Sequence, residues 1–285
     1  MPTLQDLTTP YFPTWCPGCG NFTIWAAFKN ACVKMGWDNT NSVIVAGIGC
    51  HGHLVNYTKM TAFEGLHGRA LPVATGIKLS NHRLNVFVFT GDGDSLAEGG
   101  NHFMHACRRN HDLKIFLHDN AIYGLTTGQA SPMTPLGFHS KSTPDGNLDN
   151  PVSPMTIAIA AGASFVARGF AGDIPQLTEL FIKTVAHKGL ALLDILQPCV
   201  TFNKEYSYDF YRQNTYYLGP EHDVTNRGEA FKRSIEWGEK KIALGVLYDV
   251  DQPSYESHIP QIADKPLIET LPVRNNLEKL FKKYT

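Results

Sequence analysis

The sequence contains no apolar run approaching the ~20 residues that a membrane-spanning helix requires. It also has no block of basic residues, and its 285 residues carry a net charge of −1. A nucleic-acid-binding surface needs an excess of Lys and Arg, so this class of partner is not expected. The first residues, MPTLQDLTTPYFPTW, lack the basic and apolar regions of a secretory leader. This predicts a protein of the cytoplasm, where thiols stay reduced.

Cysteine is scarce, with six residues in the chain, and two of them follow a helical spacing. Cys32 lies four residues after Phe28 on one predicted helical face, and Cys107 lies in a similar pattern, so both are predicted core side chains. The others lie in turns or at predicted strand ends: Cys16, Cys19, Cys50 and Cys199. The first two, in TWCPGCGN, have the spacing of half a zinc knuckle, of a thiol–disulfide pair or of two ligands to an iron–sulfur cluster.

Short β-branched runs alternate with helical stretches along most of the chain. Strands are predicted at 42–49, 84–90, 113–119, 162–168 and 190–196, and helices at 21–36, 95–110 and 174–188. This alternation predicts an α/β fold, a mostly parallel sheet with helices on both faces. We divide the chain into an N-terminal arm (1–20), a central domain (21–203) and a C-terminal extension (204–285), with a further helix predicted over 227–245.

Glycine-rich turns follow two of the predicted strands. The first, GDGDSLAEGG, precedes a helix and places Gly91 and Gly93 where backbone N–H groups meet an anion. The second is DNAIYGLT, which contains Asn120. Between Gly-Asp-Gly and Asn120 lie 26 residues, and this is the spacing of the thiamin-diphosphate motif. Mg²⁺ prefers oxygen ligands shared with phosphate groups. The predicted Mg²⁺ ligands are therefore Asp92, the Asn120 side chain and the Ile122 carbonyl.

Several segments together resemble the β subunits of the 2-oxoacid:ferredoxin oxidoreductases: TWCPGCGNF, GIGC, GLHGRALPVATGIKLS, GDGDSLAEGGNHFMHACRRN, DNAIYGLTTGQASP and DILQPCVTFN. The resemblance implies thiamin diphosphate, Mg²⁺ and one 4Fe–4S cluster, the last held by Cys16, Cys19, Cys50 and Cys199. The ligand count alone also suits structural zinc, so a zinc-bearing binding or scaffold protein is the alternative from another class. A redox-inert zinc adds nothing to electron transfer beside thiamin, which favours the cluster.

The resemblance also supplies contacts to thiamin diphosphate: Ile48, Gly49, Cys50, His51, His67, Gly91, Gly93, Asp94, Gly124, Leu125 and Thr126. Among them His51 and His67 are the catalytic candidates, with a structural hydrogen-bonding role as the alternative. One position departs from the family pattern, because Thr127 stands where many relatives carry Lys. If that position senses the charge of the substrate or of the diphosphate, the positive charge has to come from elsewhere, for which His53 and Lys59 are candidates.

The activity that the resemblance implies is the reversible, CoA-dependent oxidative decarboxylation of a 2-oxoacid, with electrons passing singly through the cluster to ferredoxin. The segments GNHFMHACRRN and HGRALPVATGIKLS favour 2-oxoglutarate, which would give succinyl-CoA, and pyruvate is the alternative. Thiamin enzymes also need a pyrimidine-binding domain, which has no counterpart in this chain. An α subunit is expected to supply it, in an (αβ)₂ assembly. A thiamin decarboxylase that needs no cluster is the closer rival.

Overall fold

The computed structural model describes residues 1–238, 241–270 and 281–283, and within them an eight-stranded sheet forms the centre of the molecule. The strand order is β2-β1-β3-β4-β6-β5-β8-β7, and every neighbouring pair is parallel except β5 with β8. The strands are β1 Ser42–Ala46, β2 Ala62–Glu64, β3 Asn85–Gly91, β4 Lys114–Asp119, β5 Phe165–Phe170, β6 Ala191–Leu196, β7 Thr215–Tyr217 and β8 Ile242–Asp249. The predicted mostly parallel α/β fold is confirmed.

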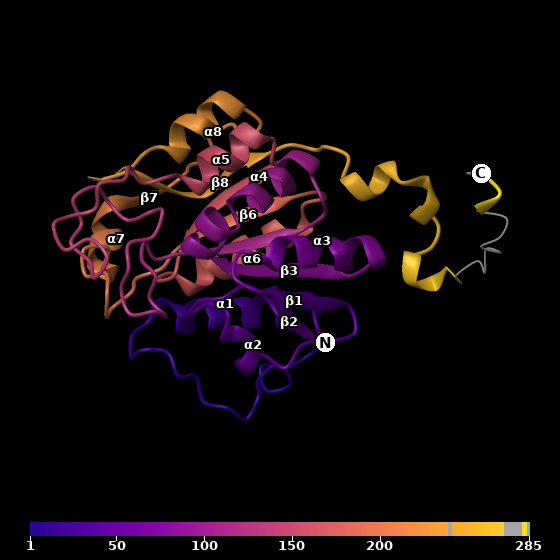
Figure 1. Ribbon diagram of the computed structural model, residues 1–285, viewed down its shortest axis with the longest axis horizontal. Coiled ribbons are helices and arrows are strands. Elements are labelled where there is room, and N and C mark those ends of the chain that lie inside the picture. Colours follow the sequence, from indigo (N-terminus) through magenta and orange to yellow (C-terminus); the bar gives the residue numbers. More distant parts are fainter. Residues whose placement is uncertain (239–240, 271–280, 284–285) are drawn as a thin grey trace.

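Helices cover both faces of the sheet (Figure 1). They are α1 Gly20–Met35, α2 Leu54–Tyr57, α3 Ala70–Ser80, α4 Gly100–Arg109, α5 Pro154–Ala161, α6 Ile174–Ala186, α7 Tyr208–Asn214 and α8 Arg227–Ser234. On one face α1 and α6 bring Phe28 and Phe181 against Phe116 of β4, with ring centroids 6.1 and 4.6 Å away. On the other face α3, α4 and α5 bury a second apolar layer against the same strands. Buried on both sides, the central strands are mostly apolar, as parallel strands usually are, and the buried Arg168 of β5 pairs with Asp194 of β6 over 3.0 Å.

The predicted elements of the central domain are present within a few residues of their expected bounds. The helix predicted over 95–110 is divided, since a π-turn at Asp94–Glu98 precedes α4. Cys32 and Cys107 are fully buried, one in each apolar layer, which confirms them as core side chains.

The helix predicted over 227–245 is wrong in its second half. α8 ends at Ser234, and the run IALGVLYD forms β8, which pairs with β5. A continuous apolar run of this length fits a buried strand as well as a helix, so its period alone did not distinguish them. The C-terminal extension thus contributes β7 and β8 to the central sheet, while its residues 239–240, 271–280 and 284–285 lie outside the described part. The three-part division of the chain remains a prediction.

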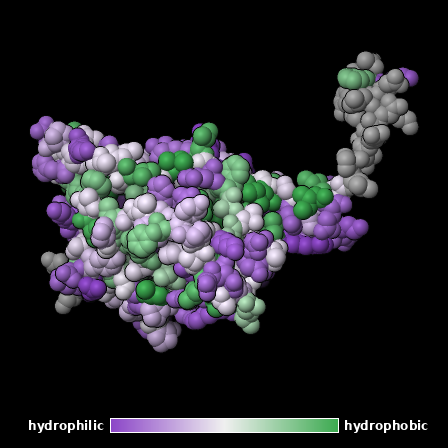
Figure 2. All heavy atoms as spheres, turned by 90° about the horizontal axis from the view of Figure 1, so that it is seen from below, coloured by the Kyte–Doolittle hydropathy of each residue, from purple (hydrophilic) through white to green (hydrophobic). Residues whose placement is uncertain are grey.

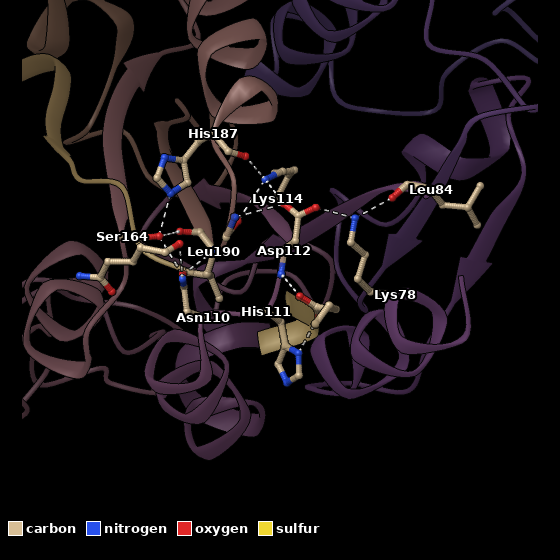
Figure 3. Close-up of polar contacts among 12 residues, drawn as sticks. Lys78, Leu84, Asn110, His111, Asp112, Lys114, Ser164, His187 and Leu190 are labelled. Carbon is tan, nitrogen blue, oxygen red and sulfur yellow. Dashed lines mark hydrogen bonds and ion pairs between the residues drawn. The ribbon is translucent and has the colours of Figure 1, made fainter. Parts of the chain in front are cut away.

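A polar network closes the edge of the sheet where β4, β5 and β6 begin (Figure 3). Lys114 Nζ donates to Asp112 Oδ1 over 2.6 Å. Ser164 Oγ lies 2.7 Å from His187 Nε2, and His187 Nδ1 lies 2.9 Å from Asp249 of β8. These three groups have the order of a Ser-His-Asp triad. Ser164 is fully buried, however, so its hydroxyl meets no substrate, and the network instead fastens β8 to the base of the sheet.

The surface carries apolar side chains in small groups among hydrophilic ones, as the face in Figure 2 shows. Among the described helices, none combines the length and hydropathy needed to cross a bilayer. Exposed large apolar residues include Tyr11 and Phe12 in the arm and Leu66 and Leu125 in the loops at the carboxyl ends of the strands.

Candidate active site

The carboxyl ends of β1, β3, β4 and β6 meet at one edge, because these strands are parallel neighbours. The loops that leave them carry GIGC, GDGD, DNAIYG and QPC. The N-terminal arm crosses the same edge. Trp15 Nε1 donates to the Cys50 carbonyl over 2.7 Å, and the Gly20 amide donates to the Pro198 carbonyl over 3.2 Å. The fold therefore gathers all the chemistry-bearing motifs of the sequence in one place.

Asp94 joins three of the loops at this edge. Its buried carboxylate accepts hydrogen bonds from the amides of Ile48 (3.2 Å) and Gly68 (2.8 Å), and from the Thr90 hydroxyl (2.6 Å). His67 Nδ1 lies 2.7 Å from the same carboxylate. An ionised carboxylate only accepts, so Nδ1 of His67 carries the proton. Asp94 thus fixes the walls of the cavity that these loops enclose.

Two glycines at this edge have no room for a side chain. A Cβ added to Gly47 would lie 1.7 Å from Asp94 Oδ2, and one added to Gly93 would lie 2.2 Å from the ring of Tyr123. Both distances are far below van der Waals contact, so either substitution would push away the group that it meets. Gly93 lines the cavity, where the lack of a side chain lets the backbone approach a ligand, as glycine-rich loops do around phosphate groups. The Gly47 amide instead donates to the Phe89 carbonyl over 3.0 Å.

The predicted Mg²⁺ ligands come together from the ends of two adjacent strands. Asp92 follows β3 and is 3% exposed, and Ser131 donates to it over 2.5 Å. Burial raises the pKa of Asp92 to about 7. Asn120 follows β4, and its Oδ1 accepts from the Ile122 amide over 3.1 Å, which closes the turn between them. A carboxylate, an amide oxygen and a carbonyl at one cavity form a donor set that fits a hard cation such as Mg²⁺.

Every residue predicted to contact thiamin diphosphate or Mg²⁺ lines a single cavity: Ile48, Gly49, Cys50, His51, His67, Gly91, Asp92, Gly93, Asp94, Asn120, Ile122, Gly124, Leu125 and Thr126. The structure adds Tyr123, whose ring covers Gly93 and whose hydroxyl donates to Glu98 over 3.1 Å. Only its place within DNAIYG marked Tyr123 in the sequence. Tyr123 is part of the cavity wall because its side chain contacts Gly93 and Glu98, and sequence spacing does not reveal these contacts.

The two candidate histidines differ in environment. His51 is buried, and burial lowers its pKa to about 4, so its imidazole is neutral at pH 7. Its Nε2 lies 3.9 Å from Asp94 Oδ2, and its ring centroid lies 5.7 Å from that of the buried His118. His67 is half-buried at the open side of the cavity. His51 is therefore suited to orienting a ligand rather than to supplying a proton, and the catalytic roles of both residues remain predictions.

The cysteines outside the core line a second cavity next to the first: Cys16, Cys19, Cys50 and Cys199. Cys50, Gly124, Leu125 and Asn120 line both cavities. A Cβ added to Gly124 would lie 3.6 Å from Cys50 Sγ and 3.7 Å from Cys199 Sγ, so the wall between the two cavities is one residue thick at this point. Whatever occupies the cysteine cavity lies against the occupant of the other.

The thiols of the cysteine cavity influence one another. Burial raises the pKa of Cys50 to about 12, and the neighbouring cysteines add to the increase. Burial likewise raises the pKa of Cys19. Among residues 1–238, 241–270 and 281–283, no three His, Cys, Asp or Glu side chains are arranged as the ligands of one metal ion, so the four cysteines share a cavity without forming a closed ligand set.

A lysine lies at the position where the sequence departs from the family pattern. Lys141 Nζ donates to the Thr127 hydroxyl over 2.6 Å. His53 also lines the cysteine cavity, whereas Lys59 does not. Lys141 follows fourteen residues later, in a loop without regular structure, so no sequence spacing pointed to it. A cationic side chain therefore contacts Thr127 from a residue that sequence reasoning did not consider.

Comparisons with known proteins give the same picture. Residues 47–195 match the family described as "Thiamine pyrophosphate enzyme, C-terminal TPP binding domain", and residues 199–264 match the family of the C-terminal region of the pyruvate ferredoxin oxidoreductase beta chain. A 2-oxoacid:ferredoxin oxidoreductase subunit beta from Sulfolobus sp is 44% identical, over 95% of this chain and 93% of its own length. A 2-oxoglutarate oxidoreductase subunit KorB from Mycobacterium tuberculosis is 37% identical, over 94% of this chain and 76% of its own.

A solved structure extends the comparison to the fold. It is the 2-oxoglutarate:ferredoxin oxidoreductase from Magnetococcus marinus with 2-oxoglutarate, coenzyme A and succinyl-CoA bound. The TM-score is 0.91 at 33% sequence identity, and the match covers 100% of this chain and 96% of the other. These similarities extend over nearly the whole chain, beyond the motifs of the central domain. The chain belongs to the β subunits of the 2-oxoacid:ferredoxin oxidoreductases, a family of oxidoreductases.

Proposed function

We propose that this β subunit holds thiamin diphosphate in the first cavity, with Mg²⁺ bound by Asp92, Asn120 and Ile122. The cysteine cavity holds one 4Fe–4S cluster on Cys16, Cys19, Cys50 and Cys199. When bound, thiamin diphosphate stabilises the negative charge left on the substrate as CO₂ departs, and the cluster takes up the electrons one at a time. The observation that carries the proposal is that Cys50 and Gly124 line both cavities, which makes the electron path short.

The cysteine cavity is large enough for a cluster as well as for a single ion. The cavity measures about 320 Å³, and its cysteines come from the arm and from two separate strand ends. A cluster in this cavity can accept electrons from thiamin diphosphate in the neighbouring one, whereas a redox-inert zinc cannot. A cytoplasmic location is consistent with reduced thiols. The zinc-bearing scaffold remains the alternative from another class, and metal analysis distinguishes the two.

The open side of the first cavity supports a role for a second subunit. Leu66 and Leu125 stand exposed at its rim, and Leu136 and Leu148 are exposed in the loop that follows β4. Exposed apolar side chains beside a polar cavity, such as Leu125 in its lining and Leu66 next to His67, are typical of a surface that another protein covers. We assign this surface to an α subunit that brings the pyrimidine-binding domain, within an (αβ)₂ assembly. The arm of residues 1–20 then serves to clamp the cluster.

For the substrate we propose 2-oxoglutarate, which with coenzyme A gives succinyl-CoA and CO₂ and delivers two electrons, singly, to ferredoxin. Lys141 contacts Thr127, which lines the cysteine cavity and directly follows Thr126 of the thiamin cavity, so we assign to Lys141 the cation that the distal carboxylate of a 2-oxodiacid would need. Pyruvate is the second candidate, and the match of residues 199–264 to a pyruvate-oxidoreductase family favours it.

An anaerobic assay of the co-expressed αβ complex tests the proposal. The complex is supplied with coenzyme A, ferredoxin and either 2-oxoglutarate, pyruvate or a branched-chain 2-oxoacid, and ferredoxin reduction is followed. We expect 2-oxoglutarate to have the highest kcat/KM and the preparation to contain iron and sulfide. Equal or faster turnover of pyruvate would overturn the substrate assignment. A colourless preparation that contains zinc in place of iron would overturn the cluster.

A further inference from the structure

Gln197 links the cysteine cavity to the buried histidines beside the thiamin cavity. It follows β6 directly and is 1% exposed. Its backbone amide donates to the Asp119 carbonyl over 2.7 Å. Its side-chain Nε2 lies 3.6 Å from Cys19 Sγ, and its Oε1 lies 3.1 Å from His118 Nδ1. Neither Gln197 nor His118 had a function in the sequence analysis.

The chemistry of the neighbours fixes which way the Gln197 amide points. A thiolate bound to metal has no proton to give, so the amide group that faces Cys19 has to be the NH₂. The amide oxygen then faces His118 Nδ1, which also lies 2.8 Å from the Asn21 side-chain oxygen. Two oxygen acceptors at Nδ1 require that nitrogen to carry the proton of the neutral imidazole. His118 therefore holds Gln197 with its N–H groups toward the sulfur.

The packing leaves Gln197 little freedom to turn. A Cβ added to Gly20 would lie 2.6 Å from Gln197 Cγ, so α1 begins in direct contact with this side chain. Cys19 is the N-cap of α1, and its side chain makes no capping hydrogen bond to the helix backbone. The positive N-terminal end of a 16-residue helix and the side-chain N–H of Gln197 thus both lie at one sulfur.

We propose that Gln197, oriented by His118, is a positioning residue that raises the reduction potential of the cluster through its N–H···S hydrogen bond to Cys19. The inference rests on the proposed function, because it requires the cluster. Reduction adds one electron to the cluster and breaks no bond, and oxidation by ferredoxin removes that electron again. N–H donors to a ligand sulfur stabilise the more negative, reduced state. The cluster beside the cofactor becomes a better electron acceptor.

The test is a redox titration of the anaerobic αβ complex followed by the EPR signal of the reduced cluster. Gln197→Leu removes the N–H donor, and Gln197→Glu keeps the shape but places a carboxylate oxygen at the sulfur. We expect the potential to fall in both, by the equivalent of about a tenfold change in the reduction equilibrium for Gln197→Leu, or about 59 mV for a one-electron couple, and by more for Gln197→Glu. Gln176→Leu, a glutamine of α6 away from both cavities, is the matched control and leaves the potential unchanged.

Variants of His118 show whether His118 affects the potential by orienting the Gln197 amide or only by packing against it. His118→Leu frees the Gln197 amide and lowers the potential, whereas His118→Asn, whose NH₂ replaces the Nδ1 donor, restores it. Iron and sulfide analysis accompanies each variant, and only variants with full cluster content are compared. Unchanged potentials in Gln197→Leu and Gln197→Glu, with the cluster intact, overturn the inference and leave the proposed function standing. A wild-type complex without iron overturns the proposed function itself.

Discussion

Replacing Asp94 by Asn is expected to lower the free energy of unfolding by an amount that follows from the hydrogen bonds of its carboxylate. Oδ1 of Asp94 accepts from the amides of Ile48 and Gly68, which cannot be reversed, whereas Oδ2 accepts from the Thr90 hydroxyl, which can turn round and accept instead. The Asn side chain therefore places its NH₂ toward Thr90 and keeps every hydrogen bond. Only the charge is lost. Hydrogen bonds to charged groups contribute about 1.5–3 kcal/mol and neutral ones about 0.5–1.5, so each of these three loses about 1 kcal/mol. The fourth partner, His67, is 35% exposed, and its contact is screened by solvent and is not counted.

The expected loss for Asp94→Asn is about 3 kcal/mol in the free energy of unfolding, or a Tm lower by about 6 °C at roughly 2 °C per kcal/mol for a chain of this size. Asp94→Ala leaves two buried amides without a partner, at about 1–3 kcal/mol each in addition to the hydroxyl's lost bond, and is expected to be worse. Calorimetry of the αβ complex measures both, and titration with thiamin diphosphate shows whether affinity falls in the same order.

The control for the Asp94 series is Asp209→Asn, at an exposed carboxylate that pairs with Arg212 on the surface of α7, where less than about 0.5 kcal/mol is expected. An Asp94→Asn complex as stable as wild type would refute the reasoning, because the charge would then contribute nothing. Equal losses for Asn and Ala would refute it as well, because the rotation of the Thr90 hydroxyl would then rescue no hydrogen bond.

Three further predictions concern the cluster, the C-terminal extension and the substrate. Cys199→Ser should abolish ferredoxin reduction and lower the iron content, and full turnover in this variant would instead favour a cluster-free thiamin enzyme. Burial alone would raise the pKa of Glu256, but hydrogen bonds from His111 (2.8 Å) and the Asp112 amide outweigh it and lower the pKa below 4.5. The stabilisation by Glu256 is therefore fully present above pH 4.5 and lost as the pH falls through the folded-state pKa, so denaturant titrations of Glu256→Gln should show less loss of stability on acidification than wild type. Lys141→Ala should raise the KM for 2-oxoglutarate about tenfold, the equivalent of 1.4 kcal/mol, and leave the KM for pyruvate unchanged; steady-state assays with both acids would contradict the prediction if the two changed together.

The sequence was most informative where a residue type is required by backbone geometry or by ligand chemistry. Gly93 and the run before Asp92 indicated a glycine turn after a buried strand, and the four non-core cysteines stood apart because each lacked a helical neighbour pattern. Parallel strands then bring such turns together without further information, since all their carboxyl ends share one edge.

Contacts between loops distant in the sequence could not be predicted in the same way. Lys141 reaches Thr127, and Gln197 reaches Cys19, only because the fold places their segments side by side. Likewise, the run that forms β8 has no periodicity to distinguish strand from helix, and its conformation is decided by pairing with β5. Tertiary contact, which neither spacing nor composition encodes, determines these features.

The central claim is that electrons pass from the thiamin cavity to a cluster held on the other side of Cys50 and Gly124. The most direct measurement is EPR of the anaerobic αβ complex, frozen after addition of 2-oxoglutarate and coenzyme A, with and without thiamin diphosphate. The account predicts a reduced 4Fe–4S signal that appears only when substrate and thiamin diphosphate are both present, and that is absent in Cys50→Ser. A complex that turns over 2-oxoglutarate without any such signal, or whose signal ignores thiamin diphosphate, would contradict it.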